Sequence, residues 1–165
     1  MQDQNNPRIS TARNIARKLL AGACITRPPV MIKDIVNLLR KTRDLSVYPW
    51  ALGENTDGIQ ATEGSKIAIG YNHSQHPHRQ RFTVAHEIGH FLMGHTSANY
   101  YNDLKSKDPK EIEANQFAAE LLMPLAMLKN DLNDGKKAKE LALLYNVSEE
   151  SMWWRLCDSK LINNL

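Results

Sequence analysis

The segment from Arg79 to Gly94 restricts the fold of this chain more than any other. It sets two histidines and a glutamate, His86, His90 and Glu87, among apolar or small residues. Those neighbours predict a buried helix: Phe82, Ala85, Ile88, Gly89 and Leu92. Buried imidazole and carboxylate groups are costly unless they have partners. The fold must therefore bring a partner to this helix, and a metal ion is the partner we expect.

The three polar residues follow the HExxH pattern over residues 86–90. Residues four apart share one face of a helix, so His86 and His90 can bind one metal ion. Glu87 lies beside them and can accept a proton from a metal-activated water that attacks a peptide carbonyl. The pattern predicts a metallopeptidase with one divalent ion. Zinc is the expected metal, and manganese or iron would also suit such a site.

A catalytic zinc site has three protein ligands and one open position. The third is expected on a helix that begins at Asp108-Pro109 and reaches about Met123. The apolar face of that helix consists of Ala114, Phe117, Ala118, Leu121 and Leu122. Glu111 lies roughly 50° from the middle of this face, and Glu113 and Glu120 lie roughly 100° or more away. Glu111 is the predicted ligand and Glu113 the runner-up, while Glu113 and Glu120 are expected to be solvated.

Other polar side chains near the motif have weaker signals. His95 is turned away from the ligand face and is expected to be structural or solvent-facing. The histidines of the loop 72–78 are expected to be solvated. Tyr100 or Tyr101 could donate a hydrogen bond to an oxyanion, although packing or surface placement is favoured for both.

The remaining pattern predicts an α+β fold in which a small antiparallel sheet packs on helices. The expected strands are Leu45–Trp50, Ile59–Thr62 and Lys66–Tyr71, the last two joined at Glu63-Gly64 as a hairpin. The other expected helices are Ser10–Ala21, Val30–Arg40, Lys136–Tyr145 and Ser148–Lys160. We expect a catalytic domain over residues 1–130, with residues 131–165 as a helical appendix packed on it.

Charge and cysteine content limit the class of protein. The net charge of +3 comes without a dense basic stripe, so direct nucleic-acid binding is not expected. The two cysteines, Cys24 and Cys157, form no metal-binding or disulfide framework. No apolar run has the length of a membrane span, and the N-terminus lacks the pattern of a signal peptide. A cytoplasmic protein is expected.

Two long motifs resemble those of the ImmA/IrrE family of metallo-endopeptidases: RFTVAHEIGH at residues 81–90 and EIEANQFAAELLMP at residues 111–124. The resemblance extends over about residues 10–160. It implies a zincin-like fold, His86 and His90 as ligands, Glu87 as catalytic base and Glu111 as third ligand. Some members of this family, which is typical of bacteria, phages and mobile elements, cleave a helix-turn-helix repressor. Such a repressor is the expected partner.

The resemblance also suggests how a substrate is held. In zincin-like folds a strand beside the active helix pairs with the substrate as an added strand. We expect Lys66–Tyr71 to be that edge strand, with the N–H of Ala68 available to the substrate. Specificity would then come from the C-terminal helices, with Trp153 and Trp154, or from the loop 96–107.

Two other functions remain open. The first is a DNA-binding regulator, because Glu140 to Leu156 has the rhythm of a helix-turn-helix. Its second helix begins Ser148-Glu149-Glu150, and acidic groups there would repel phosphates. The second is a catalytically silent, metal-bound antitoxin or partner-binding protein, against which the presence of Glu87 argues weakly.

Overall fold

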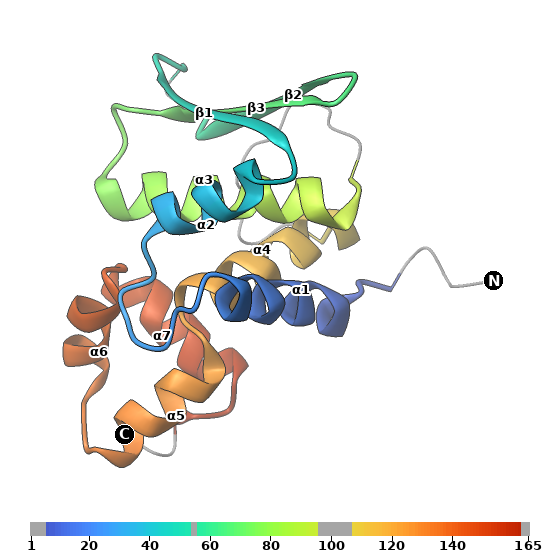
Figure 1. The fold of residues 1–165 in the computed structure, drawn as a ribbon. Helices are drawn as coiled ribbons and strands as arrows, with labels where there is room; N and C mark the ends of the chain where they lie inside the picture. Colours follow the sequence, from blue (N-terminus) through green and yellow to red (C-terminus); the bar gives the residue numbers. More distant parts are fainter. Residues whose placement is uncertain (1–5, 54–55, 96–106, 163–165) are drawn as a thin grey trace.

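The computed structural model describes residues 6–53, 56–95 and 107–162, and within them the protein is an α+β fold (Figure 1). The helices are α1 (Ile9–Gly22), α2 (Ile32–Arg40), α3 (Pro77–Met93), α4 (Pro109–Leu122), α5 (Leu125–Asn133), α6 (Ala138–Tyr145) and α7 (Glu149–Asp158). The strands are β1 (Asp44–Trp50), β2 (Gly58–Glu63) and β3 (Lys66–Asn72). The α+β class is confirmed, and α5 is a helix that the sequence pattern did not predict.

The sheet has the strand order β1-β3-β2. The predicted hairpin is confirmed: β2 and β3 are antiparallel and turn at Gly64, whose φ of +58° suits a glycine. The expectation of a wholly antiparallel sheet is wrong, because β1 runs parallel to β3, with Asp44 opposite Lys66 and Trp50 opposite Asn72. The sheet is therefore mixed.

This strand order also corrects the expected edge strand. Ala68 of β3 lies opposite Ser46 on one side and Ala61 on the other, so β3 is the middle strand and has no free edge. The role expected for the Ala68 N–H is therefore wrong. Within the described residues, the unpaired edge of the sheet on the side that contacts α3 is that of β2, whereas β1 forms the opposite edge.

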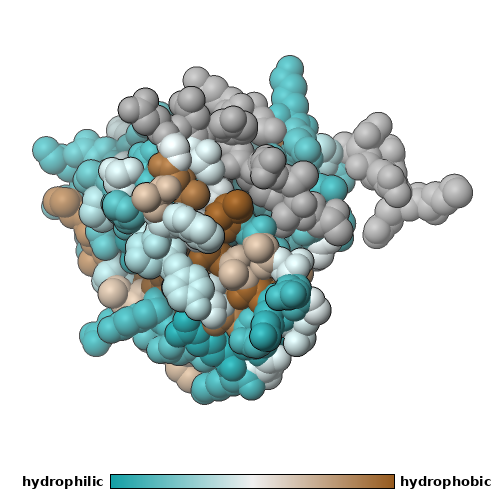
Figure 2. Space-filling model, turned by 90° about the horizontal axis from the view of Figure 1, so that it is seen from above, coloured by the Kyte–Doolittle hydropathy of each residue, from teal (hydrophilic) through white to brown (hydrophobic). Residues whose placement is uncertain are grey.

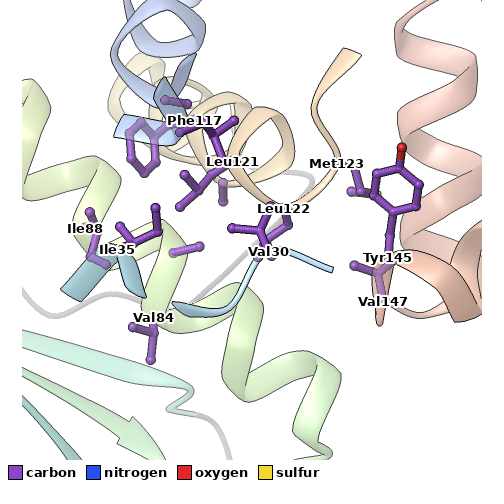
Figure 3. Close-up of a cluster of buried hydrophobic side chains, with 14 of the residues drawn as sticks. Val30, Ile35, Val84, Ile88, Phe117, Leu121, Leu122, Met123, Tyr145 and Val147 are labelled. Carbon is purple, nitrogen blue, oxygen red and sulfur yellow. The ribbon is translucent and has the colours of Figure 1, made fainter. Parts of the chain in front are cut away.

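The sheet lies over α3, which packs on α4, and α4 packs on α1 (Figure 1). Inward residues of the strands, such as Leu45, Ile67 and Ile69, are buried. Figure 3 shows the core beneath them, where Ile88 of α3 lies close to Phe117 and Leu121 of α4. Burying large side chains on both faces of α3 fixes this helix between the sheet and α4.

The opposite face of the sheet points away from the described helices. Figure 2 looks down on it and shows apolar residues surrounded by hydrophilic ones. Tyr48 and Trp50, two positions apart on β1, are 53% and 55% exposed there. Only the other face of the sheet contributes to the core.

The C-terminal helices share the core of the rest of the protein. Met152 and Leu156 of α7 are fully buried, and the Tyr145 hydroxyl of α6 donates to Asp131 Oδ2 at 2.7 Å. The expected domain boundary at residue 130 falls within α5. Among the described residues, no helix is both long and apolar enough to cross a membrane.

Candidate metal centre

Local signals fix both ends of α3. The helix begins at Pro77, two residues before the expected start, because the His76 ring accepts a hydrogen bond from the His78 backbone N–H at 3.2 Å. It ends at Gly94, which has the left-handed φ of +71° common after helices. This span places His86 and His90 one turn apart in the middle of a buried helix.

Helix α4 begins as the sequence predicts. The Asp108 side chain accepts from the Lys110 backbone N–H at 2.8 Å, and Pro109 occupies the first turn. Glu111 therefore lies in the first turn of α4, and the packing of α4 on α3 brings its carboxylate to the two histidines.

His86, His90 and Glu111 form one buried cluster. Glu111 Oε2 lies 3.2 Å from His86 Nε2, and Glu111 Oε1 lies 3.1 Å from His90 Nε2. The two Nε2 atoms are 2.9 Å apart. Both histidines have no exposed surface. The structure thus brings together the three predicted ligands in the geometry of a metal site.

The hydrogen-bond partners of the two Nδ1 atoms indicate which kind of ion the cluster can bind. His86 Nδ1 lies 2.8 Å from the Asn115 amide oxygen, which can only accept, so Nδ1 donates, and in the neutral ring Nε2 is the nitrogen with the lone pair. His90 Nδ1 is likewise occupied, by His95 Nδ1 at 2.8 Å. Two imidazole Nε2 atoms and a carboxylate thus meet at one point. A divalent cation fits this donor set, since all three groups are metal ligands.

The carboxylate of Glu111 is an anion. Burial alone raises its pKa, but hydrogen bonding and charge from His86 and His90 outweigh burial and lower the pKa to about 2. An ionised carboxylate is the form that binds a metal.

Glu87 lies apart from the cluster, toward the sheet. It has no exposed surface, and neither carboxylate oxygen has a hydrogen-bond partner among the described residues. Burial raises its pKa to about 7, with His90 lowering it and Glu111 raising it further. A Cβ placed on Gly58 of β2 would lie 3.2 Å from Glu87 Oε1. Glu87 therefore faces the start of β2, and its carboxylate oxygens have no partner in the described part of the chain.

The other two glutamates of α4 are buried, so their expected solvation is wrong. Glu113 binds Arg8 and His95, and Glu120 binds Arg17 and Arg155. The apolar face of α4 alone predicted their solvation, but α1 and Arg155 of α7 cover other sides of this helix. The runner-up Glu113 is not part of the cluster.

Three residues around the cluster were missed or left undecided by the sequence. Asn115 follows Glu111 by four positions, and this spacing could have indicated that it faces the same site. His95 is structural, since it is buried against His90. No pattern in the sequence indicated that Arg8 would lie near the cluster. Tyr100 and Tyr101 lie outside the described residues.

A groove of about 310 Å³ opens beside the cluster, between α3, α4 and α7. Its wall includes Phe82, whose ring centroid is 6.3 Å from that of His86, and Asn115, the hydrogen-bond partner of His86. Trp154 of α7 lines the far side and is 59% exposed, while its neighbour Trp153 does not line the groove. The groove thus extends from two neighbours of His86 to α7.

Comparison with known proteins gives matches of three kinds: to a family model, to a phage protein and to solved structures. The family model described as the IrrE N-terminal-like domain, Peptidase_M78, matches residues 51–156. Uncharacterized immunity region protein 2 of Bacillus phage phi105 is 29% identical over 111 residues, which cover 65% of this chain and 70% of that protein. A solved Mycobacterium tuberculosis transcriptional regulator shares the fold with a TM-score of 0.65 at 15% identity. That match covers 89% of this chain but spans only 46% of the regulator.

Proposed function

This chain belongs to the family of IrrE N-terminal-like domains, Peptidase_M78, and on that premise we propose that it is a metal-dependent endopeptidase. His86, His90 and Glu111 would hold one divalent ion, proposed to be zinc, and leave one position open for water. The ion would polarise the peptide carbonyl and make water a better nucleophile. The observation that carries the proposal is the convergence of two imidazole Nε2 atoms and one carboxylate on a single buried point.

Glu87 is the general base of the proposed reaction. It removes a proton from water as the oxygen attacks the carbonyl carbon of the scissile bond, and then delivers that proton to the leaving amine. The unpaired carboxylate and its raised pKa suit both steps, because a base that must also act as an acid works best near neutral pKa.

The substrate is proposed to lie along β2. The Asn72 N–H donates to the Asp57 carbonyl at 2.8 Å, and hydrogen-bonded pairs alternate along an antiparallel ladder. The backbone groups of Gly58, Gln60 and Thr62 therefore face away from β3, toward the free edge. An extended peptide that pairs with them passes the carboxylate of Glu87.

A helix-turn-helix repressor is the proposed substrate, and the cytoplasm the proposed compartment. Support comes from the family resemblance and from the phage relative, whose name places it in an immunity region. The groove lined by Phe82 and Trp154 supports selectivity beyond backbone pairing, because it offers a recognition surface at the edge of the cluster.

Direct DNA binding is supported less well. Helices α6 and α7 are joined by the short turn expected of a helix-turn-helix, with Asn146 in the left-handed conformation. However, α7 begins with the exposed residues Glu149 and Glu150, which would face phosphates in that mode of binding.

The proposal is tested by incubating the purified, zinc-loaded protein with the repressor encoded nearest to its gene, and with casein, each with and without a chelator. We expect chelator-sensitive cleavage of the repressor at one or a few bonds, and little cleavage of casein. Rapid digestion of casein with the repressor intact would exclude a dedicated regulator. No cleavage of either substrate by protein that binds zinc would favour the silent, partner-binding alternative.

A further inference from the structure

A chain of buried hydrogen bonds leads away from one ligand of the cluster. His90 Nδ1 lies 2.8 Å from His95 Nδ1, and His95 Nε2 lies 2.8 Å from Glu113 Oε2. Glu113 is in turn held by Arg8, through the backbone N–H at 2.8 Å, Nε at 3.0 Å and Nη2 at 2.8 Å. Four residues thus form one connected line: His90 of α3, His95 just after α3, Glu113 of α4 and Arg8 just before α1.

The chemistry of these atoms fixes where the protons lie. Glu113 bound by a guanidinium is an acceptor only, so His95 Nε2 carries a proton and donates it. The short contact between the two Nδ1 atoms needs one proton between them. If His90 binds metal through Nε2, its Nδ1 is the protonated atom, and His95 Nδ1 accepts.

We propose that His95 and Glu113, clamped by Arg8, are positioning residues that hold His90 in the Nδ1–H form and aim its Nε2 at the metal. The proposal rests on the proposed function, and it assigns roles to residues that do not touch the metal or the substrate. Orienting partners of this kind raise the basicity of a ligand imidazole and fix its ring.

The two proposed histidine ligands have different hydrogen-bond partners. The line from His90 through His95 and Glu113 to Arg8, here called the relay, can therefore be altered without changing the partners of His86. His86 is oriented by Asn115 on α4, close to the ligand Glu111. His90 is oriented through a line that ends at Arg8, the residue before α1. Glu113 is 5% exposed whereas Arg8 is 46% exposed, so the start of α1 is the accessible end of the relay. Loss of any inner member would leave a buried group unpaired.

The test compares three zinc-loaded variants with the wild type. His95→Leu removes the acceptor for His90 Nδ1–H, and we expect its Kd for zinc to rise about 10- to 100-fold. His95→Gln keeps an acceptor oxygen and should recover much of that loss. Zinc affinity is measured by competition with a chromogenic chelator. Two-bond proton–nitrogen NMR spectra report which nitrogen of His90 carries the proton and should show Nδ1–H in the wild type and in His95→Gln.

Glu120→Gln is the matched control. Glu120 is also buried on α4 and paired with arginines, but it does not contact His95. We expect it to lower thermal stability while leaving the Kd for zinc unchanged. The relay is overturned if His95→Leu binds zinc as the wild type does, if Glu120→Gln weakens binding equally, or if His90 binds zinc through Nδ1. A wild type that takes up no zinc would overturn the proposed function, and the relay with it.

Discussion

Gly89 of α3 lies against the ring of Phe117 of α4. A Cβ placed on Gly89 would fall 2.9 Å from Phe117 Cδ1 and 3.2 Å from Phe117 Cβ, closer than side chains pack. Phe117 is fully buried at this contact. The absence of a side chain at position 89 therefore sets how closely α4 approaches α3, and with it the distance from Glu111 to His86 and His90.

The first prediction follows from this contact. Gly89→Ala should lower the free energy of unfolding by roughly 1–3 kcal/mol, because the added methyl group overpacks the interface. Thermal unfolding of the chelator-treated protein measures the effect without metal. The double variant Gly89→Ala/Phe117→Leu should recover part of the loss. If Gly89→Ala is as stable as the wild type, the helices can separate freely and the contact does not set their distance.

The second prediction concerns Glu87. Glu87→Gln should bind zinc with the affinity of the wild type, because Glu87 is not part of the ligand cluster. Its kcat should fall by about two to four orders of magnitude, which is the usual contribution of a positioned general base. Zinc titration and cleavage of the repressor are measured on the same preparation. Wild-type cleavage by this variant would assign the base to another residue.

The third prediction distinguishes Glu111, the proposed third metal ligand, from Glu113, which belongs to the proposed relay. Glu111→Ala should weaken zinc binding far more than Glu113→Ala, since Glu111 lies within 3.2 Å of both histidine Nε2 atoms, whereas Glu113 contacts His95 and not the cluster. The Kd of each variant is measured by chelator competition. The reverse order would move the third ligand to Glu113 and contradict the observed cluster.

Local patterns in the sequence were sufficient for much of the site. Helical spacing places His86 and His90 on one face, and the apolar face of α4 points Glu111 inward. The Asp108-Pro109 start of α4 and the turn at Gly64 also follow from local chemistry. These features depend only on residues a few positions apart.

The misplaced features depend on contacts between distant segments. Alternation in β3 indicates which side chains face the core, but it does not say that Ala68 has a strand on either side. Glu113 and Glu120 are buried because Arg8, Arg17 and Arg155 reach them from other helices. The spacing of apolar residues along one helix does not indicate which residues of other helices contact it.

The fourth prediction tests the free edge of β2. Gln60→Pro removes a backbone N–H that faces the edge, and should reduce kcat/KM for the repressor while leaving zinc content unchanged. Gln60→Ala is the matched control, because it removes the same side chain and keeps the N–H. We expect Gln60→Ala to cleave at close to the wild-type rate. Equal activity of the two variants would show that the substrate does not pair with this strand.

The last prediction concerns the groove between α3, α4 and α7. Trp154 lines the groove and Trp153, the preceding residue, does not, although 59% and 45% of their surfaces are exposed. If the repressor occupies the groove, Trp154→Ala should raise KM roughly tenfold or more, because exposed tryptophans commonly dominate recognition surfaces. Its kcat should change little, since Trp154 is not in the metal cluster. Trp153→Ala serves as the control and should retain the wild-type KM. An equal effect of both substitutions would point to binding over the whole exposed side of α7, and no effect of either would place substrate recognition elsewhere.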